Sequence, residues 1–140
     1  MYLLDTVVVS ELRKRRRNAG VVDWFERQRA VDIFISVVSI GEIERGIARQ
    51  RATDPNFAAM LADWLDRILV VYSGQILPFD LKASRRWGTL SAAIGNQNAD
   101  VMIAATALEH GLAVVTGNVS HFERTGAAIF NPFRPDRRPN

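Results

Sequence analysis

The chain has 140 residues, of which 48% are hydrophobic and 24% are charged, and it carries a net charge of +3. This length suits a single domain, and the lack of cysteine excludes disulfides and thiolate metal sites, so any bound metal must take oxygen or imidazole ligands. No apolar run approaches the roughly 18 residues of a membrane span, and no basic leader precedes the first predicted strand, so we expect a cytoplasmic protein that does not contact a membrane.

The chain begins with a short apolar run that reaches a carboxylate and a hydroxyl. Residues 2–4 have the composition of a strand buried on both faces, and Asp5 and Thr6 follow at once. Ligands of open α/β sheets bind beyond the carboxyl ends of the strands, so Asp5 is a candidate metal or substrate contact. Asp5 and Thr6 are also good helix caps, and a helix is predicted over 8–17. Position alone leaves both interpretations open.

A basic run ends that first helix. Arg13, Lys14 and Arg15, with the two arginines after them, supply much of the excess positive charge, which favours polyanionic partners. The run is either a solvated helix end, where cations complement the helix dipole, or a contact for nucleic-acid phosphate. The residues at 18–20 are predicted to end the helix. A second helix and a strand are then predicted over 21–29 and 32–36.

Ser39 and Glu42 have the spacing of a capping box at the start of a helix predicted over 39–50. In such a box, the serine side chain and the glutamate three residues later satisfy each other's backbone donors. This structural role for Glu42 has to be weighed against a role as a site carboxylate. Glu44, on the same helix, is expected at the surface.

The middle of the chain is predicted to be helical and core-forming. A helix begins at 53–55, with a proline just inside it, and carries an apolar stripe at three-four spacing that we interpret as core. The stripe consists of Phe57, Met60, Leu61, Trp64, Leu65 and Ile68. After a strand over 75–79, Asp80 is expected to cap a helix over 81–94.

The last third of the chain carries another acid near the start of a helix. A helix of small residues is predicted over 99–110, with Asp100 in its first turn, where a carboxylate complements the dipole. A buried strand over 112–116, a loop or short helix over 117–123 and a last strand over 127–130 follow. Residues 1–133 are expected to form the single domain, and residues 134–140 a disordered basic tail.

Helices that alternate with short apolar strands predict an α/β fold with a mainly parallel sheet covered on both faces. Right-handed crossovers place successive strand ends at one rim of such a sheet. Asp5, Ser39 with Glu42, Asp80 and the loop over 116–121 all follow strands, so we expect them to share this rim. Asp100 precedes a strand, and topology alone does not bring it there.

These motifs occur together in an order that resembles one protein family, the PIN-domain ribonucleases. Each motif alone is common, but the ordered set at this chain length is specific. Within the family, the chain most resembles the VapC-type toxins of bacterial toxin–antitoxin pairs, including the FitB-like branch, over residues 1–133. The set, in chain order, is Leu3-Leu4-Asp5-Thr6, Val8-Val9-Ser10-Glu11-Leu12, Ser39-x-x-Glu42, Asp100-x-x-Ile103-Ala104-Ala105-Thr106-Ala107, Val115-Thr116-x-Asn118 and Phe122.

The resemblance implies a three-layer α/β/α sandwich and a Mg²⁺- or Mn²⁺-dependent endoribonuclease that a cognate VapB-like antitoxin inhibits. It also implies a homodimer that contacts operator DNA only through the antitoxin. Asp5, Glu42 and Asp100 match the family's metal-binding acids, Thr6 matches the hydroxyl beside the first acid, and Asn118 matches a polar position near the site. Mg²⁺ prefers oxygen ligands and keeps several waters, so converging carboxylates and an RNA phosphate suit it. Without a metal, clustered acids repel one another, which raises the pKa of at least one carboxyl.

Two positions depart from the family pattern. Val7 stands where the family usually has asparagine, and its side chain cannot brace the first acid, a loss of about 1 kcal/mol. His121 stands where related toxins commonly carry a fourth aspartate. A neutral imidazole binds Mn²⁺ acceptably and Mg²⁺ poorly, so we expect His121 to shift the metal preference toward Mn²⁺ or to carry a proton near neutral pH. The alternative is a surface histidine in a loop that aligns differently.

The sequence leaves two functional hypotheses. In the first, the protein is an active ribonuclease toxin whose catalytic residues are Asp5, Glu42, Asp100 and His121. In the second, Val7 and His121 weaken the site, and the protein acts mainly as a PIN module that binds its antitoxin and represses their shared operon. A nucleotide-binding flavodoxin-like domain is disfavoured, because no glycine-rich phosphate loop follows the first strand.

Overall fold

The computed structural model describes residues 1–133, in which five short strands form one parallel sheet in the order β3-β2-β1-β4-β5. The expectation of a disordered tail over 134–140 lies outside the described residues. All four strand pairings are parallel, and β1 lies at the centre between β2 and β4. The strands are β1 (Tyr2–Leu4), β2 (Ile33–Ser36), β3 (Ile76–Leu77), β4 (Ala113–Val115) and β5 (Ile129–Phe130).

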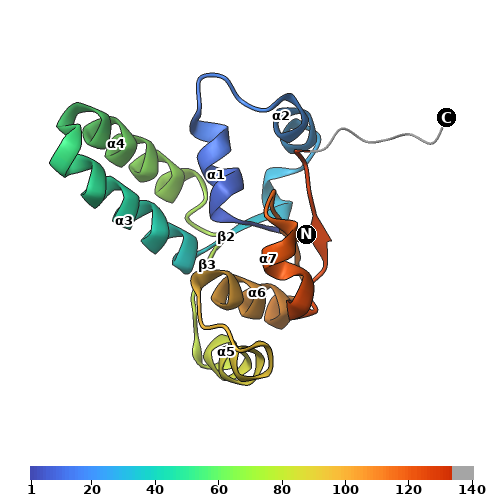
Figure 1. Ribbon diagram of the computed structural model, residues 1–140. Coiled ribbons are helices and arrows are strands. Elements are labelled where there is room, and N and C mark those ends of the chain that lie inside the picture. The colour runs from blue at the N-terminus through green and yellow to red at the C-terminus, as the bar shows by residue number, and fades with distance from the viewer. Residues whose placement is uncertain (134–140) are drawn as a thin grey trace.

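Helices connect the strands and cover both faces of the sheet (Figure 1). Helices α3 and α4 form a long hairpin that projects beyond the sheet, whereas α5 and α6 pack together on the other side. Within residues 1–133, no helix is both long and apolar enough to cross a membrane. The helices are α1 (Thr6–Arg13), α2 (Ala19–Glu26), α3 (Val37–Thr53), α4 (Pro55–Val71), α5 (Leu81–Ile94), α6 (Ala99–His110) and α7 (Val119–Phe122), with short 3₁₀ helices η1 (Ala30–Asp32) and η2 (Glu123–Thr125).

Neighbouring residues of the central strand enter two different cores, because successive side chains of a strand point to opposite faces. Leu4 packs with residues of α1 to α4, including Val8 and Ile47. Leu3 packs on the other face with residues of α6 and α7, including Ile103 and Phe122. The sheet therefore has helices on both faces, and the predicted three-layer α/β/α architecture is confirmed.

The first helix is shorter than predicted and begins earlier. It starts at Thr6 rather than at 8 and ends at Arg13 rather than at 17. Glu11 accounts for the early end, because its carboxylate accepts the backbone N–H of Asn18 at 2.8 Å and pairs with Lys14 at 2.7 Å, which turns the chain. The residues at 18–20 begin α2, with Asn18 as the cap, so the prediction that they only end a helix is wrong.

The predicted capping box of Ser39 and Glu42 is also wrong. Helix α3 begins after β2 without a loop, and Ser36 caps it by accepting the backbone N–H of Val38 at 3.0 Å. Ser39 therefore lies inside the helix, where it is fully buried. Glu42 has no capping function, which leaves its carboxylate available to the rim of the sheet.

Two predictions about the middle helices have different outcomes. Asp80 caps α5 as predicted, since its Oδ1 accepts the backbone N–H of Ala83 at 2.9 Å. The predicted core residue Met60 is 68% exposed, whereas Ala58 and Leu65 on the same helix are each 1% exposed. Met60 is two residues, or about 200° of helix rotation, from Ala58, so it lies on the opposite face of α4.

Candidate functional site

Asp5 follows the central strand and lies at the carboxyl rim of the sheet. The residue is 2% exposed. Its Oδ1 accepts the backbone N–H of Thr6 at 2.8 Å, and its Oδ2 accepts the hydroxyl of Thr116, beyond the end of β4, at 2.8 Å. The cap and the rim position therefore coexist, because one carboxylate oxygen serves the start of α1 while the other is turned toward the neighbouring strand.

Glu42 is held against the rim by Thr6. The Thr6 Oγ1 lies 2.7 Å from Glu42 Oε1 and 3.0 Å from Ser39 Oγ. Because an ionised carboxylate can only accept, Thr6 donates its single hydroxyl proton to Glu42 and accepts that of Ser39. The buried Ser39 therefore supports Thr6, which in turn orients the exposed Glu42 carboxylate.

Asp100 reaches the rim from the first turn of α6, where it meets His121 of α7. The Asp100 Oδ2 lies 2.9 Å from His121 Nδ1. Phe122, the next residue, is fully buried and packs in the core on that face, which anchors α7. The His121 side chain is 53% exposed, but it contacts the acid cluster and is not an isolated surface residue.

The effect of the neighbouring acids is clearest in the pKa of the Asp5 carboxyl. The pKa of its carboxyl is raised to about 6, first by burial and further by the nearby charges of Asp100 and Glu42, against the lowering effect of the hydrogen bonds from Thr116 and the Thr6 N–H. This confirms the expectation that clustering raises a pKa, although burial is the largest cause. Neutralisation of Asp5 by a proton or by a cation is therefore favourable.

The donor set fits a hard cation that retains water. Within residues 1–133, no three acid or histidine side chains converge closely enough to enclose a metal ion on their own. Mg²⁺ does not require such enclosure, because it is commonly bound through one or two carboxylates, several waters and substrate phosphates. One or two of the carboxylates of Asp5, Glu42 and Asp100 could bind such an ion in this way, and the burial that raises the pKa of Asp5 favours neutralisation of its charge.

Other predicted site residues have different placements. Asn118 enters the network through its backbone N–H, which donates to Thr116 Oγ1 at 2.9 Å. Lys14 pairs with Glu11, and the guanidinium of Arg13 lies 5.4 Å from the ring centroid of Phe57. Helix α1 starts at the rim, so it carries this basic run about 12 Å away from the acids at 1.5 Å per residue. The basic run therefore does not belong to the acid cluster.

Sequence reasoning missed the role of Thr116. It accounts for one of the two hydrogen bonds to the buried carboxylate of Asp5 and accepts the backbone N–H of Asn118. The available signal was a threonine that directly follows a buried strand. That strand, β4, is a neighbour of β1 in the sheet. That neighbourhood follows from the strand order, which the sequence did not provide.

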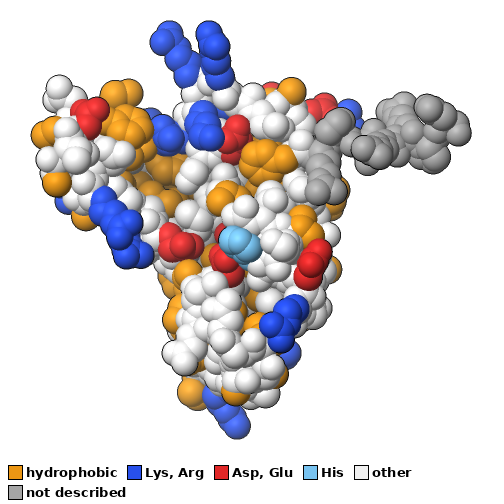
Figure 2. Space-filling model, in the orientation of Figure 1, with side chains coloured by type: hydrophobic (Ala, Val, Ile, Leu, Met, Phe, Trp, Pro, Cys, Tyr) orange, Lys and Arg blue, Asp and Glu red, His pale blue; other side chains and the backbone are white. Residues whose placement is uncertain are grey.

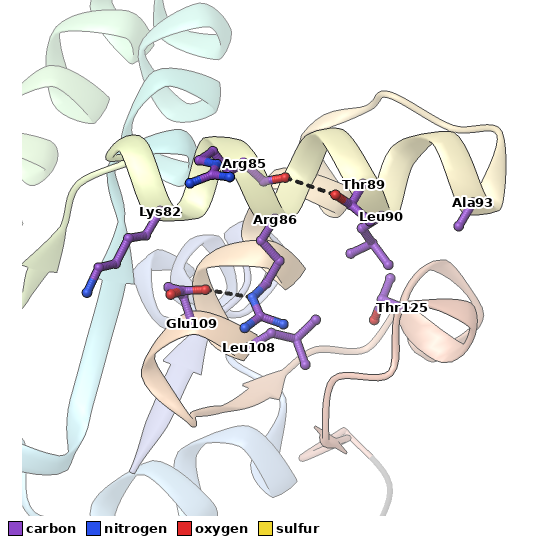
Figure 3. A pocket seen from close by; sticks show the side chains of 9 residues that line it. All are labelled: Lys82, Arg85, Arg86, Thr89, Leu90, Ala93, Leu108, Glu109 and Thr125. Atoms are coloured by element: carbon purple, nitrogen blue, oxygen red, sulfur yellow. Dashed lines mark hydrogen bonds and ion pairs between the residues drawn. The ribbon is translucent and has the colours of Figure 1, made fainter.

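The surface around the acids is uneven in charge. Figure 2 shows acidic side chains beside a histidine near the middle of this face, with cations toward its margins. A separate hollow lies between α5, α6 and η2, where Arg86 Nε pairs with Glu109 Oε2 at 2.6 Å (Figure 3). None of the three candidate acids lines that hollow.

Comparison with known proteins places the chain in a family. Residues 2–128 match the PIN domain. The chain is 35% identical to VapC ribonuclease Y4jK of Sinorhizobium fredii, over 96% of this chain and 99% of that protein. It is 31% identical to toxin FitB of Neisseria gonorrhoeae, over 95% of this chain and 99% of that protein. The structure of FitAB bound to the IR36 DNA fragment matches with a TM-score of 0.85 and 29% identity, over 99% of both chains.

The chain therefore belongs to the PIN-domain family. Its similarity to a VapC ribonuclease and to toxin FitB confirms the resemblance that the ordered motifs carry.

Proposed function

We propose that the protein is a metal-dependent endoribonuclease toxin of a VapBC-type toxin–antitoxin pair. The observation that carries the proposal is the buried Asp5 carboxylate with its pKa raised to about 6 beside the acids Glu42 and Asp100. The relatives named as a VapC ribonuclease and as toxin FitB support the same activity. Mg²⁺ is the proposed cofactor and Mn²⁺ the alternative, because both take carboxylate oxygens.

The residues of this site would bind and position a cation and the RNA phosphate. A bound divalent ion supplies polarisation of a phosphoryl oxygen and a lowered pKa of a water. Thr116 and the Thr6 N–H fix both oxygens of Asp5, and Thr6 Oγ1 fixes one oxygen of Glu42. Such outer contacts keep ligating carboxylates in one orientation, which lowers the cost of ordering them on binding.

His121 can hold a proton beside the site. An ionised Asp100 only accepts, so the Nδ1 of His121 donates to it, and the Nε2 of the neutral ring is then the acceptor. The side chain of His121 is 53% exposed. Its Nε2 can therefore take up a proton and return it to solvent. We therefore propose His121 as a proton carrier for RNA cleavage, in addition to the three acids.

Removing the hydroxyl that orients Glu42 is expected to weaken cleavage without abolishing it. Thr6→Val should lower the rate of single-stranded RNA cleavage about 10- to 100-fold, because Glu42 loses its donor. Thr6→Ser keeps the hydroxyl and should retain most of the activity. Thr89→Val, at an exposed position on α5, is the matched control. Equal rates for Thr6→Val and the natural protein would show that Thr6 does not position Glu42.

Replacing His121 by aspartate is expected to change the metal preference. His121→Asp adds a carboxylate beside Asp100, so cleavage in Mg²⁺ should rise relative to cleavage in Mn²⁺. The measurement is the ratio of the two cleavage rates on one single-stranded RNA, with His110→Gln as a control at the far end of α6. If the two proteins behave alike in both metals, His121 has no influence on the metal.

The proposed partners follow from the toxin–antitoxin assignment. They are a VapB-like antitoxin, a second copy of this chain in a homodimer, the RNA substrate, and operator DNA contacted only through the antitoxin. The solved FitAB assembly bound to a DNA fragment supports a complex that binds DNA. Arg13, Lys14 and Arg15 remain candidate RNA contacts at a distance from the acids, where added salt should weaken binding.

The second hypothesis, a catalytically weakened module, is favoured by Val7, which is partly exposed and cannot hydrogen-bond to Asp5. Expression of the chain without an antitoxin separates the two. The toxin hypothesis predicts growth arrest that Asp100→Asn relieves at equal protein levels. Tight antitoxin binding without any growth arrest would identify the module instead.

A further inference from the structure

We propose that a hollow beside Asp100 binds an RNA nucleotide that flanks the cleaved bond, with a preference for uracil or guanine; this rests on the proposed ribonuclease function. The hollow has a volume of about 340 Å³, within the range of about 300 to 1,000 Å³ for small-molecule sites. It is connected to the acid cluster because His121, which contacts Asp100, forms part of its wall. Its other lining residues include Ile94, Asn96, Asn98, Ser120 and Arg124.

Two asparagines line this hollow, and the oxygen of each carboxamide accepts a backbone N–H. The Oδ1 of Asn98 accepts the backbone N–H of Val101 at 3.3 Å, and the Oδ1 of Asn96 accepts the backbone N–H of Asn98 at 3.0 Å. A carboxamide has one oxygen and one NH₂ group. Because the α5–α6 loop engages both oxygens, the NH₂ groups are the parts best able to meet a ligand. These backbone donors also fix which way each carboxamide points.

Arg124 adds a cation to this set of donors. It is exposed, and it forms no ion pair in the part of the chain that the structure describes. A guanidinium can donate to a phosphate or lie flat against a base. Ser120, which carries a hydroxyl, also lines the hollow. The hollow is thus richer in donors than in carboxylate acceptors.

The apolar part of the wall favours a nucleotide over a simple anion. The partly exposed Ile94 contributes apolar surface, which a base face can cover and a phosphate cannot. Sequence-specific proteins read single-stranded RNA by contacting unstacked bases along their edges. Guanine O6 and uracil O4 accept hydrogen bonds, whereas adenine N6 and cytosine N4, at the same ring position, are amino donors. An amide donor that contacts this ring position therefore favours uracil or guanine.

Binding of short oligoribonucleotides tests this preference without cleavage. In a protein that carries Asp5→Asn, hexauridylate should bind about 3- to 10-fold more tightly than hexacytidylate, the effect of about one hydrogen bond. Adding Asn98→Ser should remove this difference and leave the melting temperature nearly unchanged, because serine also caps a helix well. Arg124→Gln should weaken the binding of both oligomers. Arg85→Gln, an arginine in the separate hollow of Figure 3, should change neither.

Cleavage of a randomised single-stranded RNA by the otherwise natural protein separates failure of this inference from failure of the proposed function. We expect uracil or guanine to be enriched at one position beside the cleaved bond, and Asn98→Ser to remove the enrichment while cleavage continues. Cleavage with no base enrichment, or with an enrichment that Asn98→Ser leaves intact, overturns the subsite and leaves the ribonuclease standing. If the natural protein neither cleaves nor binds RNA, the proposed function fails, and the subsite with it.

Discussion

Asp5→Asn is expected to abolish RNA cleavage and, at the same time, to stabilise the metal-free protein. The buried Asp5 has its pKa raised from 3.8 to about 6. A folded-state pKa above the unfolded value means that ionisation opposes folding, so this cost is absent below about pH 4 and complete above about pH 6. At 1.36 kcal/mol per pKa unit, ionisation of Asp5 lowers the free energy of unfolding of the natural protein by up to about 3 kcal/mol at neutral pH. Asparagine does not ionise and avoids this loss.

The measurement is thermal unfolding of both proteins in EDTA at pH 4 and pH 7.5. The variant should melt on the order of 10 °C higher at pH 7.5, whereas the difference should nearly vanish at pH 4. Asp63→Asn, at an exposed position on α4, is the matched control and should show no such pH dependence. A variant less stable than the natural protein at pH 7.5 would show that Asp5 serves the fold and not a charged site.

Asp100→Asn should also abolish cleavage, because it removes one of the three acids of the site. The same substitution should change the titration of Asp5. The charge of Asp100 is one of the causes that raise the pKa of Asp5, so the substitution should lower that pKa toward its ordinary value. Nuclear magnetic resonance titration of the Asp5 carboxyl measures the change directly. Retained cleavage in both Asp5→Asn and Asp100→Asn would remove these acids from the proposed mechanism.

The position of Asp5 could be predicted because it depends on local sequence. A short apolar run before a carboxylate indicated a buried strand and its end, and the structure places Asp5 directly after the central strand. The same local pattern suggested a helix cap, and the cap is also present. Local reasoning could not decide whether Asp5 is a cap, a ligand or both. In the structure one oxygen serves the cap and the other accepts the hydroxyl of Thr116, and the ligand role stays a prediction.

The prediction of a capping box is wrong because the spacing of a serine and a glutamate does not reveal where the helix begins after the preceding strand. Ser39 and Glu42 have the right separation, but α3 begins immediately after β2, which makes Ser36 the cap. Because the helix begins three residues earlier than the box requires, Ser39 lies in the interior and Glu42 accepts a hydrogen bond from Thr6. Topology predicted that Glu42 lies at the rim, and its contact with Thr6 agrees with that placement; its role as a metal-binding acid, which the resemblance implies, stays a prediction.

Asp100 and Thr116 show what depends on tertiary structure. Asp100 comes before a strand, and only the packing of α7 against α6 places it opposite His121. Thr116 donates to Asp5 across a sequence separation of 111 residues, through strands that are neighbours in the sheet. Neither contact has a local signature. Topology indicated that the loop over 116–121 shares a rim with Asp5, whereas only the ordered motifs indicated that Asp100 lies near them.

Removal of divalent metal is expected to stop RNA cleavage completely and reversibly. The acids at the rim repel one another, and a bound cation both relieves that repulsion and supplies the chemistry that carboxylates alone lack. Metal should therefore also raise the melting temperature of the natural protein, because it binds only the folded state. Asp5→Asn should lose most of this increase.

The most direct measurement is cleavage of a labelled single-stranded RNA by EDTA-treated protein, before and after the addition of Mg²⁺ or Mn²⁺. We predict no cleavage in EDTA, cleavage after addition of either metal, and none by Asp5→Asn under any condition. Cleavage that persists in EDTA, or a folded natural protein that cleaves no RNA in either metal, would contradict a metal-dependent ribonuclease site built from Asp5, Glu42 and Asp100.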